Sequence, residues 1–265
     1  MFKQQVDSDI QLFVGETYQS NSTILINDGE VLLVDSVGSV KDAEALKAFV
    51  EEELKKEVRF ILATHYFADH LAGLKCFPRA QIIAHRNYIH TFTTEKYRTD
   101  EEADFFVEPT ILLGDGMMMK WGRYRLEIFH NPSHTMGTLC IDVPEANLLM
   151  VGDSVVERIV YLSYSAPEIF FPALTRLQRR ARARIISSHG GVMSGDTIDK
   201  AIYYLDRLQE RVLELRRQPD SSGLILNISL ESCLAEGGKG TAVEEKYHRR
   251  NLESIVERKL FSVAA

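Results

Sequence analysis

The segment 64–70, which reads Thr-His-Tyr-Phe-Ala-Asp-His, constrains the fold more than any other part of the chain. It contains three side chains that can bind a metal, His65, Asp69 and His70, and it follows directly on the apolar run 60–63. A short apolar run is typical of a buried β-strand, and polar residues in the loop at its end commonly form a site. We therefore predict a strand that delivers metal ligands to a surface cleft from its carboxyl end.

Three later residues of ligand type occupy the same kind of position. They are His134, Asp153 and His189. Each stands at the end of an apolar run and close to a glycine. A single His or Asp in such a place is more often structural than catalytic. Here the arrangement occurs four times along the chain, always with imidazole or carboxylate groups, and this repetition predicts a shared site.

Short apolar runs and amphipathic helices alternate twice along the chain. In the first half we predict strands at 12–14, 23–26, 31–34, 60–63 and 81–84, a helix around 45–50 and another from 86. In the second half we predict strands at 125–129, 138–143, 147–151 and 184–187, with helices at 168–180 and 197–217. Strand meanders followed by helices, occurring twice, predict an α/β fold with two sheets packed face to face and helices outside.

The breaker run 219–223 divides the chain near its end. We predict a main domain over 1–218 and a C-terminal helical extension over 219–265, packed on the same domain, with its main helix at 244–260. The 265 residues, 45% of them hydrophobic, suffice for a substantial core. The tail helices fit either a dimer interface, which would make the protein a homodimer, or a lid, and the sequence does not choose between these.

The composition excludes several classes of partner. The formal net charge of −7 argues against nucleic acid, because nucleic-acid-binding proteins usually carry a concentrated basic surface. No window approaches the roughly 18 apolar residues of a membrane span, and the first residues lack the apolar segment of a signal peptide. Three scattered cysteines are too few for a disulfide framework. We expect a cytoplasmic protein that acts on a small molecule and binds neither membrane nor nucleic acid.

The order of the candidate residues resembles the metallo-β-lactamase superfamily. That family has an Asp after an early strand, then T-H-x-H-x-D-H, a His in a P-x-H-T-x-G loop, an Asp in a G-D turn, and a final His before Gly. The matches in this chain are Asp35, the segment 64–70, His134, Asp153 and His189. The resemblance covers roughly residues 10 to 215. It implies a four-layer αββα sandwich of two mixed β-sheets flanked by helices, with the site at one edge of both sheets.

One position departs from the family pattern, because Phe67 stands where the family has its second His. A phenyl ring offers no lone pair to a metal. By the resemblance, Asp69, His70 and His189 form one complete metal site, whereas the site of His65 and His134 has lost a ligand. Asp153 lies between the two sites in the family. We therefore predict one strongly bound zinc and a weakened second site; His85 or His90 is a candidate replacement, although a structural role is favoured for both.

The complete set of two imidazoles and a carboxylate suits catalytic zinc, which keeps a position open for water and lowers the pKa of that water to about 7. We predict a hydrolase of a small ester, thioester, lactone or lactam. The resemblance gives Asp153 the role of fourth ligand or general base, and His65 and His134 the role of binding a carbonyl or oxyanion. Asp35 and Thr64 are expected to support the ligands without binding metal.

Two other functions stay open at this stage. His65, His134 and Asp153 form a two-His-one-carboxylate set, the type that non-haem iron oxygenases use. By resemblance to the persulfide dioxygenases of the superfamily, the chain would then hold one iron and oxidise a sulfur compound. The third alternative is a catalytically impaired binding module, which has kept the fold although the ligand at position 67 is lost.

Overall fold

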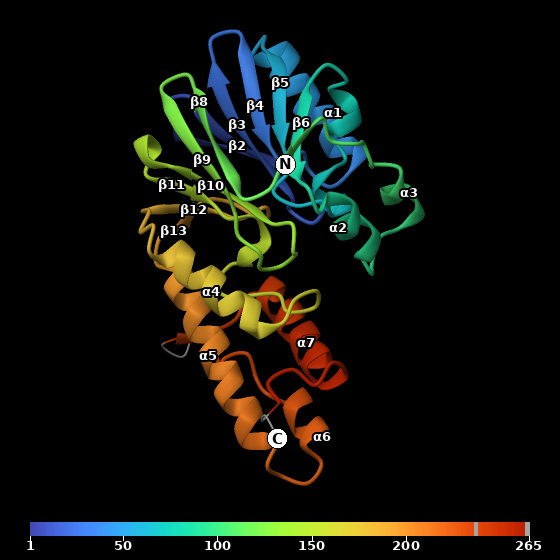
Figure 1. Ribbon diagram of the computed structural model, residues 1–265, viewed down its shortest axis with the longest axis vertical. Helices are drawn as coiled ribbons and strands as arrows, with labels where there is room; N and C mark the ends of the chain where they lie inside the picture. Colours follow the sequence, from blue (N-terminus) through green and yellow to red (C-terminus); the bar gives the residue numbers. More distant parts are fainter. Residues whose placement is uncertain (236–237, 263–265) are drawn as a thin grey trace. The chain divides into compact units, whose positions relative to one another are not determined.

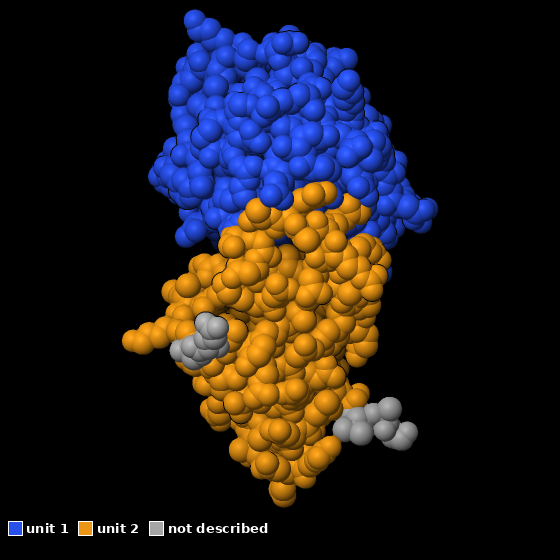
Figure 2. All heavy atoms as spheres, turned by 90° about the vertical axis from the view of Figure 1, so that its left-hand side faces the viewer, with its two compact units in different colours: residues 1–131, 136–152, 184–193 blue, residues 132–135, 153–183, 194–265 orange. Residues whose placement is uncertain are grey.

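The computed structural model describes residues 1–235 and 238–262 (Figure 1). It divides into two compact units, which are coloured separately in Figure 2. Unit 1 consists of residues 1–131, 136–152 and 184–193. Unit 2 consists of residues 132–135, 153–183 and 194–265. Each unit is therefore assembled from segments that lie far apart in the sequence.

A seven-stranded sheet in unit 1 has the strand order β1-β2-β3-β4-β5-β6-β7. Its strands are β1 (Phe2–Asp7), β2 (Ile10–Val14), β3 (Asn21–Asn27), β4 (Glu30–Val34), β5 (Glu57–Leu62), β6 (Gln81–His85) and β7 (Ile111–Leu113). Neighbouring strands are antiparallel from β1 to β4 and parallel from β4 to β7, so the sheet is mixed. Because β4 and β5 are parallel, their carboxyl ends meet at one edge, where Asp35 and the segment 64–70 begin.

A six-stranded sheet, which lies in unit 1 except for Ser194, has the order β13-β12-β11-β10-β9-β8. Its strands are β8 (Gly116–Trp121), β9 (Tyr124–His130), β10 (Leu139–Val143), β11 (Leu148–Met150), β12 (Arg184–Ile186) and β13 (Met193–Ser194). Strands β8 to β11 are antiparallel neighbours, whereas β12 runs parallel to β11. The parallel pair again places two carboxyl ends together, which are the ends that precede Asp153 and His189.

Two hydrophobic cores fill unit 1, because successive residues of a strand face opposite sides of a sheet. Leu32 belongs to the core between the two sheets, together with Ile128 and Ile141 of the second sheet. Its neighbour Leu33 belongs to the core on the other face, together with the helical residue Leu46. Unit 1 therefore has helices, the first sheet and the second sheet as successive layers.

Helices of unit 1 are short, whereas unit 2 contains both long and short helices. Unit 1 contains α1 (Val40–Ala48), which continues into a π-helical turn (Phe49–Glu53), α2 (Tyr88–Thr94) and α3 (Asp100–Ala103). Unit 2 contains α4 (Pro167–Gln178), α5 (Thr197–Leu215), α6 (Ser221–Leu226) and α7 (Ala242–Glu257). Short 3₁₀ turns occur at Ala68–His70, Leu74–Cys76, Pro144–Ala146 and Gly152–Ser154. A reciprocal capping box between Thr241 and Glu244 starts α7.

The predicted fold class is confirmed, since two mixed sheets with flanking helices are present. The four strands that sequence patterns missed are β1, β7, β8 and β13. The domain boundary at 218/219 stays a prediction, and the tail helices α6 and α7 belong to the same compact unit as α4 and α5. Among the described residues, none of the helices combines the length and the apolar character that a membrane crossing requires.

Candidate metal centre

Asp69, His70 and His189 come together within unit 1, and their ligand atoms all lie within 4.8 Å of one another. Asp69 and His70 sit on the 3₁₀ turn after β5, and His189 follows β12. One carboxylate oxygen of Asp69 is 3.4 Å from Nε2 of His70, and the other is 3.6 Å from Nε2 of His189. The Asp69 carboxylate thus lies between the two imidazoles, which is the donor set predicted for zinc.

The ring orientation of His189 is fixed by the backbone of the β2–β3 connection. Nδ1 of His189 lies 3.0 Å from the carbonyl oxygen of Tyr18. A carbonyl can only accept, so Nδ1 carries the proton and Nε2 keeps its lone pair on the side facing Asp69. The neighbouring Asn21 holds the same turn by donating from its side-chain amide to the carbonyls of Ser187 and Gly190, at 2.9 Å each. Such support by groups behind a ligand is typical of metal sites.

The loop after β4 holds the turn that carries Asp69 and His70. The carbonyl oxygen of His70 accepts hydrogen bonds from the backbone N–H and from the hydroxyl of Ser36, at 2.9 Å each. Gly38 passes so close to the turn that a Cβ atom in its place would lie 2.9 Å from the carbonyl oxygen of Asp69. The sequence therefore needs a glycine here to let the two loops approach.

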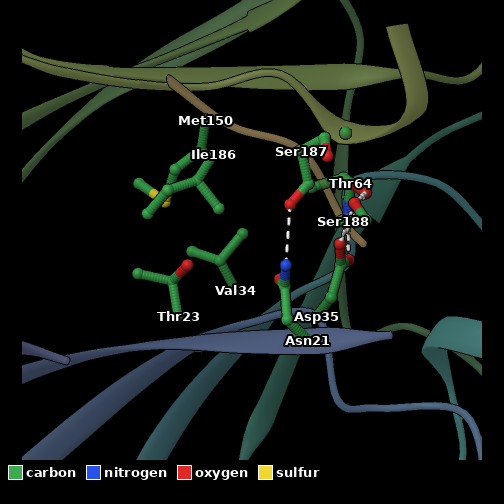
Figure 3. Close-up of a pocket in the computed structure, with 10 residues that line it drawn as sticks. Asn21, Thr23, Val34, Asp35, Thr64, Met150, Ile186, Ser187 and Ser188 are labelled. Carbon is green, nitrogen blue, oxygen red and sulfur yellow. Dashed lines mark hydrogen bonds between the residues drawn. The ribbon is translucent and has the colours of Figure 1, made fainter. Parts of the chain in front are cut away.

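Asp35 connects the loops that follow β4, β5 and β12 (Figure 3). It accepts hydrogen bonds from the backbone N–H of Thr64 at 2.7 Å, from its hydroxyl at 2.8 Å, and from the hydroxyl of Ser188 at 2.6 Å. Burial raises the pKa of the Asp35 carboxyl, and the hydrogen bonds and nearby His70 oppose this rise. A cavity of about 10 Å³, room for one water molecule, lies beside these groups, with Asn21 on its wall. Asp35 and Thr64 thus belong to one buried hydrogen-bond network, and their role in supporting the ligands stays a prediction.

His65 is buried in unit 1 beside these groups. Its Nδ1 lies 3.0 Å from the Thr64 hydroxyl oxygen. Because that hydroxyl donates its hydrogen to Asp35, it accepts one from Nδ1 of His65, so Nε2 of His65 keeps the lone pair that a ligand needs. The ring of Phe67 packs edge-on against the His65 ring, with centroids 5.3 Å apart. The side chain at position 67 is therefore next to a candidate ligand.

His134 and Asp153 belong to unit 2, where they offer ligand atoms within 4.8 Å of each other. The two segments that carry them are joined by a 2.8 Å hydrogen bond between the hydroxyls of Ser133 and Ser154. The individual roles of these residues stay predictions.

Three further residues near Asp69 had no signal in the sequence patterns. The carboxylate of Glu95 accepts the backbone N–H of Ala68 at 3.0 Å, at the start of the ligand turn. Burial, together with the charge of Asp69, raises the pKa of Glu95 to about 7. Tyr18 donates from its hydroxyl to Glu102 at 3.1 Å. Besides burial, the charge of Asp69 contributes to the raised pKa of both Glu95 and Tyr18, so both side chains lie near it, and the Glu95 carboxyl adds an acidic group close to the candidate ligands.

The two candidate replacements for the missing imidazole do not join either ligand group among the described residues. His85 stacks on His130 with ring centroids 4.0 Å apart. Burial and the neighbouring His130 lower the pKa of His85 to about 4. His90 is exposed on α2. The favoured structural role of His85 therefore has a physical basis in this stacked pair.

Comparisons with known proteins give consistent matches. The family model of the metallo-beta-lactamase superfamily matches residues 15–195, more than half of the chain. A metallo-beta-lactamase type 2 of Bacillus cereus is 27% identical over 148 residues, which are 56% of this chain and 55% of the relative. The acyl-coenzyme A thioesterase MBLAC2 of Homo sapiens is 30% identical over 150 residues, which are 49% of this chain and 52% of the relative. The chain spans about half the length of these curated relatives.

A solved structure extends the likeness to the tail. The sec-alkylsulfatase Pisa1 of Pseudomonas sp. superposes with a TM-score of 0.71 at 14% sequence identity. The match covers 98% of this chain and 50% of that protein. At this identity the likeness concerns the fold alone, and it includes the helices that follow residue 218.

Proposed function

The chain belongs to the metallo-beta-lactamase superfamily, and from this premise we propose that it is a metal-dependent hydrolase of a small-molecule ester, thioester, lactone or lactam. The single observation that carries the proposal is the Asp69, His70 and His189 group, whose ligand atoms gather within 4.8 Å. The same group is predicted from the sequence. The replacement of the family's second His by Phe67 removes none of its three ligands.

The residues present fit a zinc ion by the chemistry of their donors. Nε2 of His189 keeps its lone pair because Nδ1 donates to a carbonyl, and the Asp69 carboxylate lies beside it. Two imidazoles and one carboxylate are a known catalytic zinc set that leaves a position open. When bound, zinc supplies a water of lowered pKa as the nucleophile.

The exposure of the group agrees with a catalytic rather than a closed structural site. The side chain of His70 is fully buried, whereas 23% of the Asp69 side chain and 12% of the His189 side chain are exposed. The protein thus holds the site on one side and leaves Asp69 accessible to a substrate. We propose that His65 and His134 bind the substrate carbonyl or the developing oxyanion, and that Asp153 is a fourth ligand or takes a proton from the water.

The relatives and the charge of the chain narrow the substrate class that we propose. A thioesterase and a β-lactamase are among the relatives, so acyl thioesters and lactams are the first compounds to test. The net charge of −7 favours a small molecule over a nucleic acid as substrate. We propose one strongly bound zinc and a weakened second site.

Elemental analysis combined with a hydrolysis assay tests the proposal. The purified chain should contain about one zinc and hydrolyse at least one ester, thioester, lactone or lactam of a small panel. Asp69→Asn should abolish both properties, while Asp206→Asn, the same change on the exposed face of α5, should preserve them. Bound iron with oxygen consumption on a persulfide would contradict the hydrolase and support the dioxygenase. Absence of any bound metal after reconstitution would support a binding module instead.

A further inference from the structure

Helix α7 holds the segment that follows Asp153 by hydrogen bonds to its backbone. Both side-chain groups of Asn251 participate: the oxygen accepts the N–H of Leu162 at 2.7 Å, and the amide donates to the carbonyl of Val160 at 2.7 Å. The buried carboxylate of Glu244 accepts the backbone N–H of Arg158 at 3.1 Å and its guanidinium Nε at 2.8 Å. Buried backbone groups require such partners, so the conformation of this segment depends on α7.

The C-terminal end of α7 makes further hydrogen bonds to the same segment, at residues 162–165. Arg258 donates to the carbonyls of Leu162, Ser163 and Ser165 at 2.7 to 3.2 Å. The hydroxyl of Ser254 lies 3.2 Å from that of Ser163. Charged donors on carbonyls form the stronger class of hydrogen bonds. Residues 158–165 are thus fixed along the length of α7.

The fixed segment presents two aromatic rings to His134. Tyr161 stacks on the His134 ring at 5.4 Å with an interplanar angle of 22°, and Tyr164 meets it edge-on at 5.4 Å. Behind Tyr161 lies Tyr247 of α7, with ring centroids 4.7 Å apart. Arg250, one turn further along α7, donates to the Tyr161 hydroxyl at 3.4 Å. A continuous set of contacts therefore joins α7 to His134 within unit 2.

We propose that Tyr247 and Arg250 of α7 are positioning residues for the active site and that they act on His134 through Tyr161. This inference rests on the proposed function, because it takes His134 as a group that binds the reacting carbonyl. A ring stacked on the face of an imidazole fixes the plane of the imidazole and leaves its in-plane nitrogens to other partners. Helix α7 of the tail then contributes to the geometry of the active site.

A purely structural role for α7 makes a different prediction. If α7 only stabilises the unit, through contacts such as those of Glu244 and Asn251, removing the Tyr247 ring would lower stability and change nothing else. The positioning role requires that the surroundings of His134 change as well. The two roles are therefore separated by a measurement on His134 itself.

The test replaces Tyr247 with Leu in the full chain and follows the ring protons of His134 by NMR in the metal-free protein. Stacking on Tyr161 displaces these resonances to lower frequency, so Tyr161→Leu marks the fully unstacked position. Tyr247→Leu should move the His134 signals toward that position, and Tyr247→Phe, which keeps the ring, should restore them. Tyr203→Leu is the matched control, because Tyr203 is a 42% exposed tyrosine of α5 in the same unit.

Kinetics gives the second readout. Tyr247→Leu should lower kcat roughly tenfold or more, since small displacements of a catalytic group are costly, while KM changes little. Zinc content should be unchanged, because Asp69, His70 and His189 lie in the other unit. A variant whose His134 signals and kcat equal those of the wild type, with only Tm lowered, would overturn the inference. If no substrate is hydrolysed, the proposed function fails, and the NMR measurement still decides whether α7 positions His134.

Discussion

The two regions that carry candidate ligands are held by different kinds of contact. In unit 1, the turn of Asp69 and His70 and the neighbouring His189 are fixed by carbonyls, hydroxyls and the buried carboxylate of Asp35. In unit 2, His134 is packed between Tyr161 and Tyr164, whose segment is held by a helix almost a hundred residues later. The first region is built from strand ends and short loops, and the second depends on the tail.

This difference shows for which ligands a sequence motif is enough to identify both the ligand and its supporting partners. A polar loop that follows an apolar strand brings its own supporting partners, because neighbouring parallel strands end at the same edge of a sheet. An imidazole supported by aromatic rings needs partners that no local spacing reveals. We expect changes in unit 1 to remove metal or fold, and changes in unit 2 to alter catalysis and pH response.

The largest effect should follow from His70→Ala. His70 is fully buried and belongs to the complete ligand group, so its loss should reduce zinc content to near zero and abolish hydrolysis. A three-ligand zinc site retains little affinity after one ligand is removed. His90→Ala, which truncates an exposed histidine of α2, is the control for elemental analysis. Full zinc content in His70→Ala would mean that the metal is not held by the unit 1 group.

Asp35→Ala should lower the free energy of unfolding by about 3 kcal/mol or more. The change leaves the backbone N–H and hydroxyl of Thr64 and the hydroxyl of Ser188 without their buried acceptor, at roughly 1–3 kcal/mol for each donor. Urea unfolding at neutral pH measures the loss, with Asp206→Ala on α5 as the exposed control. A loss below about 1 kcal/mol would show that Asp35 is not the connection between the three loops.

Sequence patterns identified the interior of the fold and missed its borders. The four strands without prediction, β1, β7, β8 and β13, are the edge strands of the two sheets. Strand β1 is largely exposed, and β8 alternates between exposed and half-buried residues up to Trp121, so neither shows a buried apolar run. β7 and β13 are only three and two residues long. A hydrophobic pattern in the sequence reveals a strand through its buried side chains, and an edge strand buries few of them.

The same limit applies to the candidate metal centre. Asp69, His70 and His189 could be predicted as candidate ligands because imidazole and carboxylate groups at strand ends are recognisable in the sequence. The carbonyl of Tyr18, which fixes the ring of His189, has no signal, since every residue has a carbonyl. Glu95 is one glutamate among many, and only the fold brings it to the start of the ligand turn.

Phe67→His extends the comparison by adding a possible ligand beside His65 in unit 1. The Phe67 ring lies 5.3 Å from that of His65, so an imidazole there should bring a nitrogen close to a candidate ligand. We expect the metal content at saturation to rise from about one toward two ions per chain. Phe67→Leu, which fills the position without a donor, should leave it near one. An unchanged content in Phe67→His would mean that position 67 is not directed at the second site.

The smallest effect concerns the pH response of the tail. Burial lowers the pKa of His248 below its ordinary value of 6.5, and the charge of Glu231 partly opposes this. The neutral ring fits its contacts: Nδ1 accepts from the Tyr204 hydroxyl at 2.9 Å and Nε2 donates to the carbonyl of Ile228 at 2.9 Å.

A group whose pKa is depressed by folding contributes stability that is complete above its unfolded pKa and is lost as the pH falls below it. Tm should therefore fall between pH 7 and pH 5 by more in the wild type than in His248→Gln, because Gln can accept and donate in the same places without titrating. Thermal unfolding of the metal-free chain at both pH values measures this, with His90→Gln as the exposed control. Equal slopes for wild type and His248→Gln would show that protonation of His248 does not contribute to the acid sensitivity. The contacts of this ring would then stabilise the tail independently of its charge state.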